Sequence, residues 1–448
     1  MNNVAIARAT MGASLGFHIV FAVLGVGMPL LMSVAEGLAL WRRDETWMLL
    51  ARRWAKAFGI LFAVGAVSGT VLSFELGLLW PRFMAFSGSI LGLPFSAEGF
   101  AFFIEAIFLG LYLYGWERLS PLLHWLTSIP IVLSGAASSL FVVMANAWMN
   151  SPAGFRLGPN GQLLSVDPMA AALNPSTWTE DPHMLVSAYV VTGFLVASVY
   201  AAGLLRGRAD LAHRRGLAAG MTMGLLAIGL AGITGDASAR FIYQAQPAKF
   251  AAMEGLYRTQ NGAPSTIGGI PSNSAHRVLY GIQIPHALSW LATFDFNAPV
   301  RGLDSFPLRD RPNPVLVHLS FDSMVGFGTM LGCLAVAFWG LVLWRRRIPL
   351  WRPLLVAVVL AGPASVVAME SGWFVTEFGR QPWIIYGILR TSDGATSAPA
   401  LGQAFALFLV VYAGLAVTTA SLLLASARHN RETGHADPPA GGHAGTDS

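Results

Sequence analysis

Nine long apolar segments set the pattern of hydrophobic and polar positions along this chain. Each is about 20 residues or longer, the length at which an α-helix crosses the ~30 Å hydrocarbon core of a bilayer. The pattern therefore predicts an all-α, polytopic membrane bundle of about nine transmembrane helices. The segments lie at roughly 12–38, 57–78, 92–116, 123–148, 184–205, 217–235, 314–343, 353–374 and 401–426.

Arginine and lysine are unevenly distributed among the polar connections. The connections after the first, fifth and seventh segments carry clusters of them, and those after the third and ninth carry Arg118, Arg428 and Arg431, whereas the short alternate connections carry only isolated arginines. Cytoplasmic loops hold the excess of basic residues in membrane proteins. The N-terminus is therefore expected outside and the C-terminus in the cytoplasm. The clustered residues are Arg42, Arg43, Arg52, Arg53, Lys56, Arg206, Arg208, Arg214, Arg215, Arg345, Arg346, Arg347 and Arg352.

Composition agrees with a membrane protein and limits the metal chemistry. The chain is 54% hydrophobic and 11% charged, against about 25% charged in an ordinary soluble domain. The sole cysteine, Cys333, excludes an internal disulfide and a cysteine-ligated zinc or iron–sulfur site. A metal would have to be held by histidine, methionine or carboxylates. The excess of basic over acidic residues is concentrated on one side of the membrane. It therefore indicates topology and no nucleic-acid partner.

The connections divide the chain into four parts: residues 1–235 with six spans, an external loop at 236–313, three more spans at 314–427, and a tail at 428–448 predicted to be disordered and cytoplasmic. A loop as long as 236–313 is usually functional or disordered. Within it, the stretch from Gln246 to Glu254 is expected to form an amphipathic helix. Lys249 and Glu254 would either be solvated there or orient and deprotonate a quinol at the lipid surface.

Five side chains able to ligate iron fall in the outer half of the bilayer when residues are counted from the outer end of each span. They are His18, Glu98, His183, Met324 and Glu377. A shared depth suggests a cofactor layer. His183 and Met324 suit the two axial positions of an electron-transferring haem, although helix capping and core packing are the plainer roles. His18 would bind iron or a backbone carbonyl.

Glu98 and Glu105 are seven residues apart and therefore share one helix face. Buried carboxyl groups can pass protons. Ser138 and Asn146 on the next span extend a possible hydrogen-bonded path. The alternative is a purely structural hydrogen bond.

The stretch from Glu377 to Trp383 places a carboxylate, a guanidinium and an indole at a membrane edge. Glu377 would bind a metal or pair with Arg380, and Arg380 would suit a carboxylate such as a haem propionate. Gly379 is expected to let a large flat group approach the backbone. The alternative is an interfacial anchor of Trp and Arg at the lipid headgroups.

Taken together, these residues resemble the signature of subunit I of the cytochrome bd quinol oxidases. The resemblance covers most of the chain, and the set is specific although each motif alone is not. The motifs occur in the family's order. They are His18, the Glu98/Glu105 pair before Tyr114-Gly115-Trp116, Ala145-Asn146-Ala147-Trp148-Met149, His183 before Tyr189, Lys249 with Glu254, Met324 before Val325-Gly326, and Glu377 with Gly379-Arg380-Gln381-Pro382-Trp383.

The resemblance implies three haems. His183 and Met324 would ligate a low-spin haem b that takes electrons from quinol. His18 and Glu377 would be axial ligands in a di-haem site, with Glu98 beside them. That site would hold a high-spin haem b and an oxygen-reducing haem, which is haem d or a third haem b.

The resemblance also implies roles outside the iron ligands. Lys249 and Glu254 would bind and oxidise quinol, and Glu105 would lie on the proton route from the cytoplasm. Arg380 and Trp383 would support the haems.

A member of this family is a terminal oxidase of the bacterial cytoplasmic membrane. It would oxidise quinol at the outer face, reduce O2 to water with cytoplasmic protons, and build a proton gradient without pumping. It would pair with a second membrane subunit and sometimes a small single-helix one. Two departures stand out. Asp322 replaces an arginine common in well-studied members, and the loop is short, as in the cyanide-insensitive branch, where some members hold haem b in place of haem d.

Two other classes of membrane protein fit the pattern less well. A haem-free, proton-coupled transporter would explain the paired carboxylates but not the iron-ligating side chains at one depth. A haem–copper oxidase needs a close histidine cluster for copper. The membrane-region histidines are too widely separated for that: His18, His124, His183 and His318.

Overall fold

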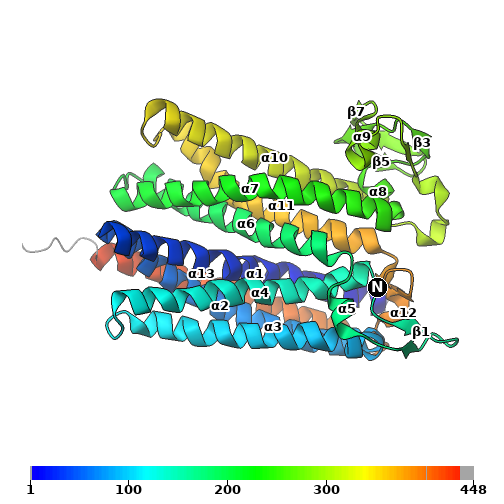
Figure 1. Ribbon diagram of the computed structural model, residues 1–448, viewed down its shortest axis with the longest axis horizontal. Helices are drawn as coiled ribbons and strands as arrows, with labels where there is room; N and C mark the ends of the chain where they lie inside the picture. The colour runs from blue at the N-terminus through cyan, green and yellow to red at the C-terminus, as the bar shows by residue number, and fades with distance from the viewer. Residues whose placement is uncertain (1–2, 400, 434–448) are drawn as a thin grey trace, which may run out of the picture.

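The structure is a computed structural model that describes residues 3–399 and 401–433. Within those residues, 9 helices are long and apolar enough to cross a membrane, which confirms the predicted all-α class. They run alongside one another as a bundle (Figure 1). They are α1 (Asn3–Arg42), α2 (Glu45–Leu79), α3 (Pro81–Gly115), α4 (Pro121–Asn150), α6 (Thr177–Leu205), α7 (Leu211–Ala245), α10 (Pro314–Arg345), α11 (Arg352–Arg380) and α13 (Leu401–Thr433).

Local sequence signals set where the helices begin. The side chains of Asp44, Asp210 and Asn313 each accept a hydrogen bond from a backbone N–H of the following turn. Pro81 and Pro121 open α3 and α4 at a position where the missing N–H would have had no helical partner.

Two helices extend past the boundaries expected from the apolar pattern, because a helix needs apolar residues only where it crosses lipid. The external loop was expected to begin at residue 236, but α7 continues to Ala245. Arg240 Nε lies 2.8 Å from Asp236 Oδ2 one turn away, and this pair stabilises the helix beyond its apolar part. At the tail, α13 continues to Thr433, past the predicted boundary at residue 428. Residues 434–448 of the predicted disordered tail lie outside the described residues.

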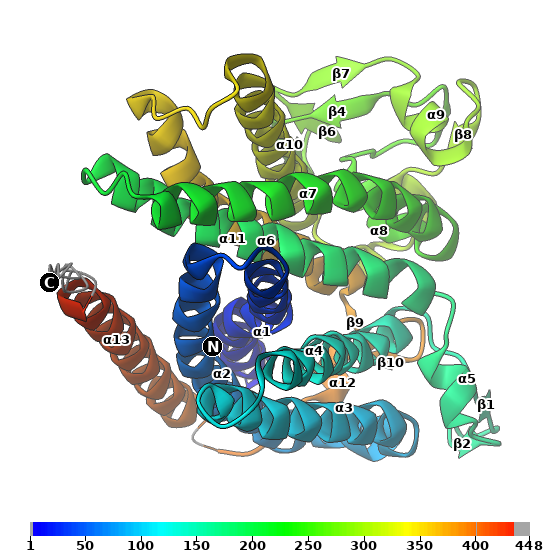
Figure 2. The ribbon, with the colours of Figure 1, turned by 60° about the vertical axis from the view of Figure 1, so that its left-hand side comes forward.

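Helices adjacent in sequence pack as antiparallel pairs, and α6 lies at the centre against α1, α4, α7 and α11. Figure 2 shows α13 at the edge of the bundle, where it contacts α1 and α2. Glycines allow the closest approach, between α6 and α7. A Cβ on Gly193 or Gly220 would lie 2.6 Å from the backbone of the other helix.

One end of the bundle carries the irregular structure, and we call it the loop end (right in Figure 1). There α8 (Pro247–Met253) leads into short antiparallel strand pairs and α9 (Ala287–Thr293). The pairs are β3 (Gln260–Asn261) with β8 (Pro299–Val300), β4 (Ser265–Ile267) with β7 (Ile282–Ile284), and β5 (Ile270–Ser272) with β6 (Arg277–Leu279). Two 3₁₀ turns come after them, η1 (Leu303–Ser305) and η2 (Leu308–Asp310).

Two smaller groups of elements also lie at the loop end. Between α4 and α6 are β1 (Arg156–Leu157), β2 (Leu163–Leu164) and α5 (Pro168–Ala172). After α11 come β9 (Trp383–Ile385), β10 (Leu389–Arg390) and α12 (Thr391–Gly394).

The opposite end holds short turns and the arginine clusters, and we call it the arginine end (left in Figure 1). Arg215 before the apolar part of α7 pairs with Asp44 between α1 and α2. The guanidinium of Arg52 lies 4.6 Å from the centre of the Trp116 ring. These contacts tie connections far apart in sequence into one surface.

Candidate functional site

A cavity of about 1760 Å³ runs through the bundle between α1, α2, α3, α4, α6, α7, α10 and α11. It exceeds the ~300–1,000 Å³ of a pocket for one drug-sized ligand. The cavity therefore has room for more than one large cofactor. Seven of the predicted site residues line it: His18, Glu98, Glu105, His183, Met324, Glu377 and Arg380.

The two lining histidines, His18 and His183, are held in the same way. His18 Nδ1 lies 2.9 Å from the Ser68 hydroxyl, and His183 Nδ1 lies 3.0 Å from the Thr234 hydroxyl. Each hydroxyl donates its own proton to a carbonyl one turn earlier in its helix. The hydroxyl must then accept from Nδ1–H, and this tautomer is assigned from the partners. Nε2 of each ring is left as the atom able to bind a metal.

Glycines keep space around these rings and along the cavity wall. A Cβ on Gly69 would lie 3.0 Å from His18 Cε1, and a Cβ on Gly235 would lie 3.2 Å from His183 Cε1. Other lining glycines border open space, since a Cβ there would meet no atom within 4 Å: Gly12, Gly229, Gly232 and Gly328. An apolar wall of this kind suits a flat macrocycle.

Met324 on α10 packs against the backbone of α11. A Cβ on Gly372 would lie 2.9 Å from Met324 Sδ, so a larger residue there would require the thioether to shift. His183 lines the same cavity from α6. The two expected axial ligands of one haem thus reach the cavity from different helices.

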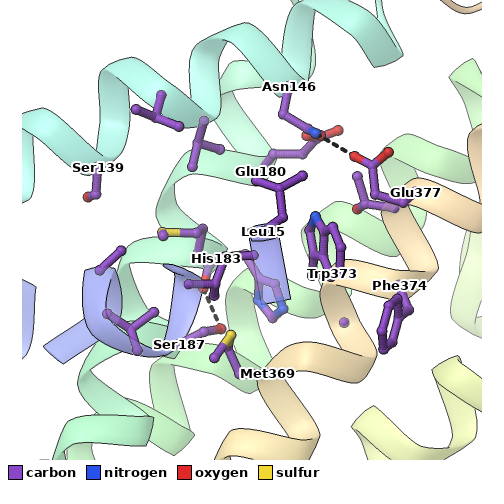
Figure 3. Close-up of a pocket in the computed structure, with 18 of the residues that line it drawn as sticks. Leu15, Ser139, Asn146, Glu180, His183, Ser187, Met369, Trp373, Phe374 and Glu377 are labelled. Atoms are coloured by element: carbon purple, nitrogen blue, oxygen red, sulfur yellow. Dashed lines mark hydrogen bonds between the residues drawn. The ribbon is translucent and has the colours of Figure 1, made fainter. Parts of the chain in front are cut away.

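A hydrogen-bonded group lies in the cavity wall on the side of the loop end (Figure 3). Asn146 Nδ2 donates to Glu377 Oε1 over 2.8 Å, and Arg380 Nη2 donates to Glu377 Oε2 over 2.7 Å. Each carboxylate oxygen keeps a second lone pair, so Glu377 is still able to ligate a metal. Arg380 is 1% exposed, and its Nε and Nη1 are buried without a partner among the described residues. Such a guanidinium fits an anionic group such as a haem propionate.

Glu98 and Glu105 both face the cavity from α3, as their spacing predicted. Ser138 Oγ donates to Glu98 Oε1 over 3.2 Å. Glu105 is deeper and buried, and within the described chain its Oε1 has no hydrogen-bond partner. Burying a carboxylate without a cation is costly, so Glu105 is suited to hold and release a proton.

Helix α8 is not the amphipathic surface helix that the sequence suggested. All its residues from Ala248 to Met253 are buried, because the helix lies between α7, α10 and α11 and the strands above it. Lys249 is 1% exposed, and a Cβ on Gly379 would lie 2.5 Å from its Cγ. The glycine therefore makes room for this lysine side chain, where the sequence suggested a flat cofactor.

The two predicted quinol residues, Lys249 and Glu254, have different surroundings and do not line the cavity. Burial lowers the pKa of Lys249 to about 8, partly opposed by the nearby charges of Glu180 and Glu377. Burial raises the pKa of Glu254 to about 7, and Ser265 Oγ donates to it over 3.2 Å. Five residues amount to well over one turn, so the two side chains leave α8 on different sides.

Glu254 belongs to a second polar cluster, together with Asp322 and His318 of α10. His318 is fully buried, with Nδ1 2.7 Å from the carbonyl of Met253 and Nε2 3.3 Å from Asp322 Oδ2. The charge of Asp322 also acts on Glu254. The cluster ties the end of α8 to α10, the helix that carries Met324.

Sequence reasoning missed Glu180, which lines the cavity beside His183 (Figure 3). It was assigned to an external loop, but α6 already begins at Thr177. Asn150 Nδ2 donates to Glu180 Oε2 over 3.3 Å and to Asn146 Oδ1 over 3.0 Å. The spacing of Glu180 and His183, three residues apart on one helix face, was the available signal.

Trp383 opens β9 and is not among the residues that line the cavity. The guanidinium of Arg390 lies 4.5 Å from the centre of its ring, and Arg390 Nη2 also pairs with Asp310. The charged side chain that Trp383 contacts is therefore paired with another loop-end residue and does not line the cavity.

Comparison with known proteins gives concordant matches. The sequence pattern described as cytochrome bd terminal oxidase subunit I matches residues 6–431. A protein of Bacillus subtilis (strain 168), with the provisional name cytochrome bd menaquinol oxidase subunit I, is 39% identical over 95% of this chain and 96% of its own. Cytochrome bd-II ubiquinol oxidase subunit 1 of Escherichia coli (strain K12) is 30% identical over 88% and 90%. A chain of the bd oxidase structure from Geobacillus thermodenitrificans superposes with a TM-score of 0.91 at 37% identity, covering 96% of this chain and 99% of that one.

Proposed function

We propose a working scheme from the premise that this chain belongs to the family of cytochrome bd terminal oxidase subunit I. It is accordingly a multi-pass protein of the bacterial inner membrane and a subunit of a quinol:oxygen oxidoreductase that uses haem and a second subunit. Because the chain belongs to a family of haem-containing oxidases, the alternative of a haem-free transporter is rejected. The geometry of the cavity and of the loop end supports roles for particular residues within that enzyme.

The cavity is proposed as the haem site. His183 and Met324 would hold a low-spin haem b, and His18, Glu98 and Glu377 would serve a di-haem site with a high-spin haem b and an oxygen-reducing haem d or b. When bound, these haems carry electrons from quinol to oxygen. The hydroxyls on both histidine Nδ1 atoms support this, because they fix each ring with Nε2 as its metal-binding atom.

Arg380 is proposed to hold the anionic edge of a haem. Its two buried guanidinium nitrogens, which have no partner within the described chain, suit a propionate carboxylate. Lys249, packed on Gly379 and close to Glu180 and Glu377, would balance the negative charge gathered there. The network through Asn146 would keep Glu377 oriented.

Quinol is proposed to bind at the loop end beside α8. Glu254 would accept the hydroxyl proton, since a carboxyl with a pKa near 7 is matched to that task. Lys249 would act from another side of the helix, through the positive charge it places near Glu377 and Arg380. In this scheme Glu254 and Lys249 both act on quinol, Glu254 as a base and Lys249 through its charge, and they do not contact the same atom.

Protons for oxygen reduction are proposed to arrive through Glu105 and Glu98, which face the cavity on one side of α3. The arginine end would face the cytoplasm by the positive-inside rule, and quinol protons would leave at the opposite face. Each charge that crosses stores about 2.3 kcal/mol per 100 mV of membrane potential. The enzyme would thus generate a proton gradient without a pump.

The observation that carries the haem assignment is the matched pair of hydroxyl-fixed histidines on one cavity. The test is a reduced-minus-oxidised absorption spectrum of the purified complex with pyridine haemochrome analysis. A far-red chlorin band would assign haem d, and b-type signals alone would place haem b at the oxygen site. His183→Ala should remove only the low-spin signal. His213→Ala, at the arginine end of α7, is the matched control and should leave the spectrum unchanged. An unaltered spectrum in His183→Ala would refute its ligand role.

A further inference from the structure

A separate buried polar cluster lies at the arginine end, where α1, α3 and α4 are side by side (Figure 2). Its members are Glu36, Tyr112 and His124, which are 1%, 0% and 2% exposed. None of them lines the haem cavity. A buried carboxyl–imidazole pair is a costly arrangement, and neither haem binding nor quinol oxidation uses it.

Both ring nitrogens of His124 are engaged. Nε2 lies 2.9 Å from the backbone oxygen of Tyr112, and Nδ1 lies 2.6 Å from Glu36 Oε1. A backbone carbonyl only accepts, so Nε2 must carry a hydrogen, an assignment that rests on the partner. The proton between Nδ1 and Oε1 is then the only one free to move. On Nδ1 it makes the pair ionic, and on Oε1 it makes both groups neutral.

One position of the pair is open to a further proton. Glu36 Oε2 and the Tyr112 hydroxyl are both buried and lie beside one another, so the phenol O–H is the group placed to donate to that carboxylate oxygen. With Oε1 occupied by His124, a proton added to the pair would sit on Oε2, next to the phenol.

The pair is close to the aqueous surface of the arginine end. The Trp116 ring lies over the His124 ring with centroids 3.9 Å apart, and the Arg52 guanidinium lies over Trp116. Glu117, the next residue, is exposed. A single aromatic side chain therefore separates the pair from the basic surface. The charged and titratable groups around the pair are Tyr112 from α3 and Arg52 from α2.

The cluster also faces inward, toward Glu105. On α3, Glu98, Glu105 and Tyr112 occur at intervals of seven residues, so they share one helix face. One turn inward from the pair, Ser128 Oγ donates to Ser33 Oγ over 2.8 Å and links α4 to α1. The polar side chains on this face of α3 and the Ser128–Ser33 pair therefore both lead from the Glu36–His124 pair toward Glu105.

At the inner end of this polar face, Gly135 of α4 and the backbone carbonyl of Gly25 of α1 lie close to Glu105. A Cβ on Gly135 would lie 3.2 Å from Glu105 Oε1 and 3.3 Å from the carbonyl oxygen of Gly25. Pro29 lacks the N–H that this carbonyl would accept within α1, so the oxygen is free for another donor. From His124 to Gly135 the rise is about 16 Å at 1.5 Å per residue, a span that hydroxyls and bound waters can bridge.

We propose that the Glu36–His124 pair is the proton-loading site that supplies Glu105 from the arginine end. It rests on the proposed proton role of Glu105. In each step the pair takes one proton from the aqueous side and releases one along Ser128 and Ser33 toward Glu105. Only O–H and N–H bonds form and break, and no electron moves. His124 and Glu36 are positioning residues for proton supply, since they touch neither substrate nor cofactor.

The test is quinol-driven oxygen consumption by the purified holo-complex. Glu36→Gln keeps a hydrogen bond to His124 but cannot exchange a proton, so kcat should fall about tenfold, below the 10²–10⁴ that a positioned acid or base contributes at the reacting atoms. KM for quinol and the haem spectrum should stay unchanged. Glu36→Asp should restore most of kcat, a rescue that a purely structural role would not give. His124→Gln provides a second variant if Glu36→Gln does not assemble, with the same expected fall.

The matched control is Tyr200→Phe, which removes another buried hydrogen bond of the arginine end, the 2.9 Å bond from Trp54 Nε1. Its kcat should not change. The double variant Glu36→Gln/Glu105→Gln should be no slower than the slower single variant, because both lie on one route. Multiplicative losses, or normal kcat in Glu36→Gln while Glu105→Gln is slow, would overturn this inference alone. A normal kcat in Glu105→Gln would instead overturn the proposed proton role on which it rests.

Discussion

The two ends of the polar interior solve the problem of buried charge in opposite ways. At the loop end, carboxylates meet cationic side chains: Glu377 with Arg380, and Glu180 near Lys249. Toward the arginine end, Glu105 has an oxygen without a partner in the described chain, and Glu36 is paired with a histidine and lies beside the Tyr112 phenol. Fixed ion pairs hold charge in place, whereas carboxyls without a permanent cation can be neutral or charged. The cavity wall at the loop end is therefore suited to bind charged groups, and the region of Glu105 and Glu36 is suited to exchange protons.

The largest effect should come from removing the fixed charge at Arg380. Arg380→Met keeps the length of the side chain but removes the buried cation that pairs with the partly exposed carboxylate of Glu377. Breaking this mostly buried pair should cost more than the ~1 kcal/mol of an exposed pair and at most about 3–5 kcal/mol, so thermal unfolding of the complex should shift down and haem per complex should fall. Arg390→Met, which breaks a half-exposed pair with Asp310, should cost no more than ~1 kcal/mol. Equal losses in both variants would mean that the Glu377–Arg380 pair stabilises the complex no more than a partly exposed ion pair does.

The next effect is kinetic and tests the exchangeable region. Glu105→Gln should lower turnover about 10²-fold, the lower bound for a positioned proton donor. The unfolding temperature and haem content should stay near normal, because the replaced carboxyl has no ion pair to lose. Glu105→Asp should recover much of the rate. Loss of all haem in Glu105→Gln would mean that this carboxyl holds cofactor and belongs with the loop-end residues.

The pH dependence of quinol oxidation separates two residues within the loop end. Glu254, with a pKa raised to about 7, must lose its proton to act as a base, so kcat/KM should rise through that pH. Lys249, with a pKa lowered to about 8, loses its positive charge above it, so kcat/KM should fall there. The profile of kcat/KM is therefore expected to be bell-shaped. Lys249→Arg should remove the alkaline fall, and an unchanged alkaline limb would exclude Lys249 as its cause.

The smallest effect is expected at Trp383. The side chain contacts Arg390 and lies outside the cavity lining. Trp383→Leu should change turnover and haem content within about twofold, as do substitutions worth ~0.5 kcal/mol away from buried features. Trp373→Leu is the matched variant, since Trp373 lines the cavity. A strong loss of haem in the Trp383 variant would extend the binding region beyond the cavity wall.

The lipid explains why much of this architecture could be predicted from sequence. A bilayer imposes span length and depth, so the nine helices of the described chain and the inward-facing positions of His18, Glu105 and His183 could be found by counting residues. Outside the lipid that constraint ends. The extension of α7 to Ala245 and the start of α6 at Thr177, which places Glu180 in the site, depend on polar residues that fit a helix or a loop equally well.

Contacts between distant segments were the other feature that sequence could not supply. Lys249 and Glu254 are close in sequence, and an amphipathic helix was the natural expectation for α8. Helical spacing alone places their side chains on different sides of α8, but their burial depends on how α10 and α11 enclose that helix. The meaning of Gly379 likewise depends on which side chain arrives from another part of the chain.

The contact between Gly379 and Lys249 has a consequence for exchanging parts between relatives. The stem of the lysine fills the space that any side chain at residue 379 would need. The segment from Gln246 to Asn313 therefore cannot be exchanged independently of α11. A loop taken from another oxidase would pack in place only if its residue at 249 were compatible with the residue at 379. Chimeras designed to alter quinol preference should carry the end of α11 together with α8 as one transplanted unit.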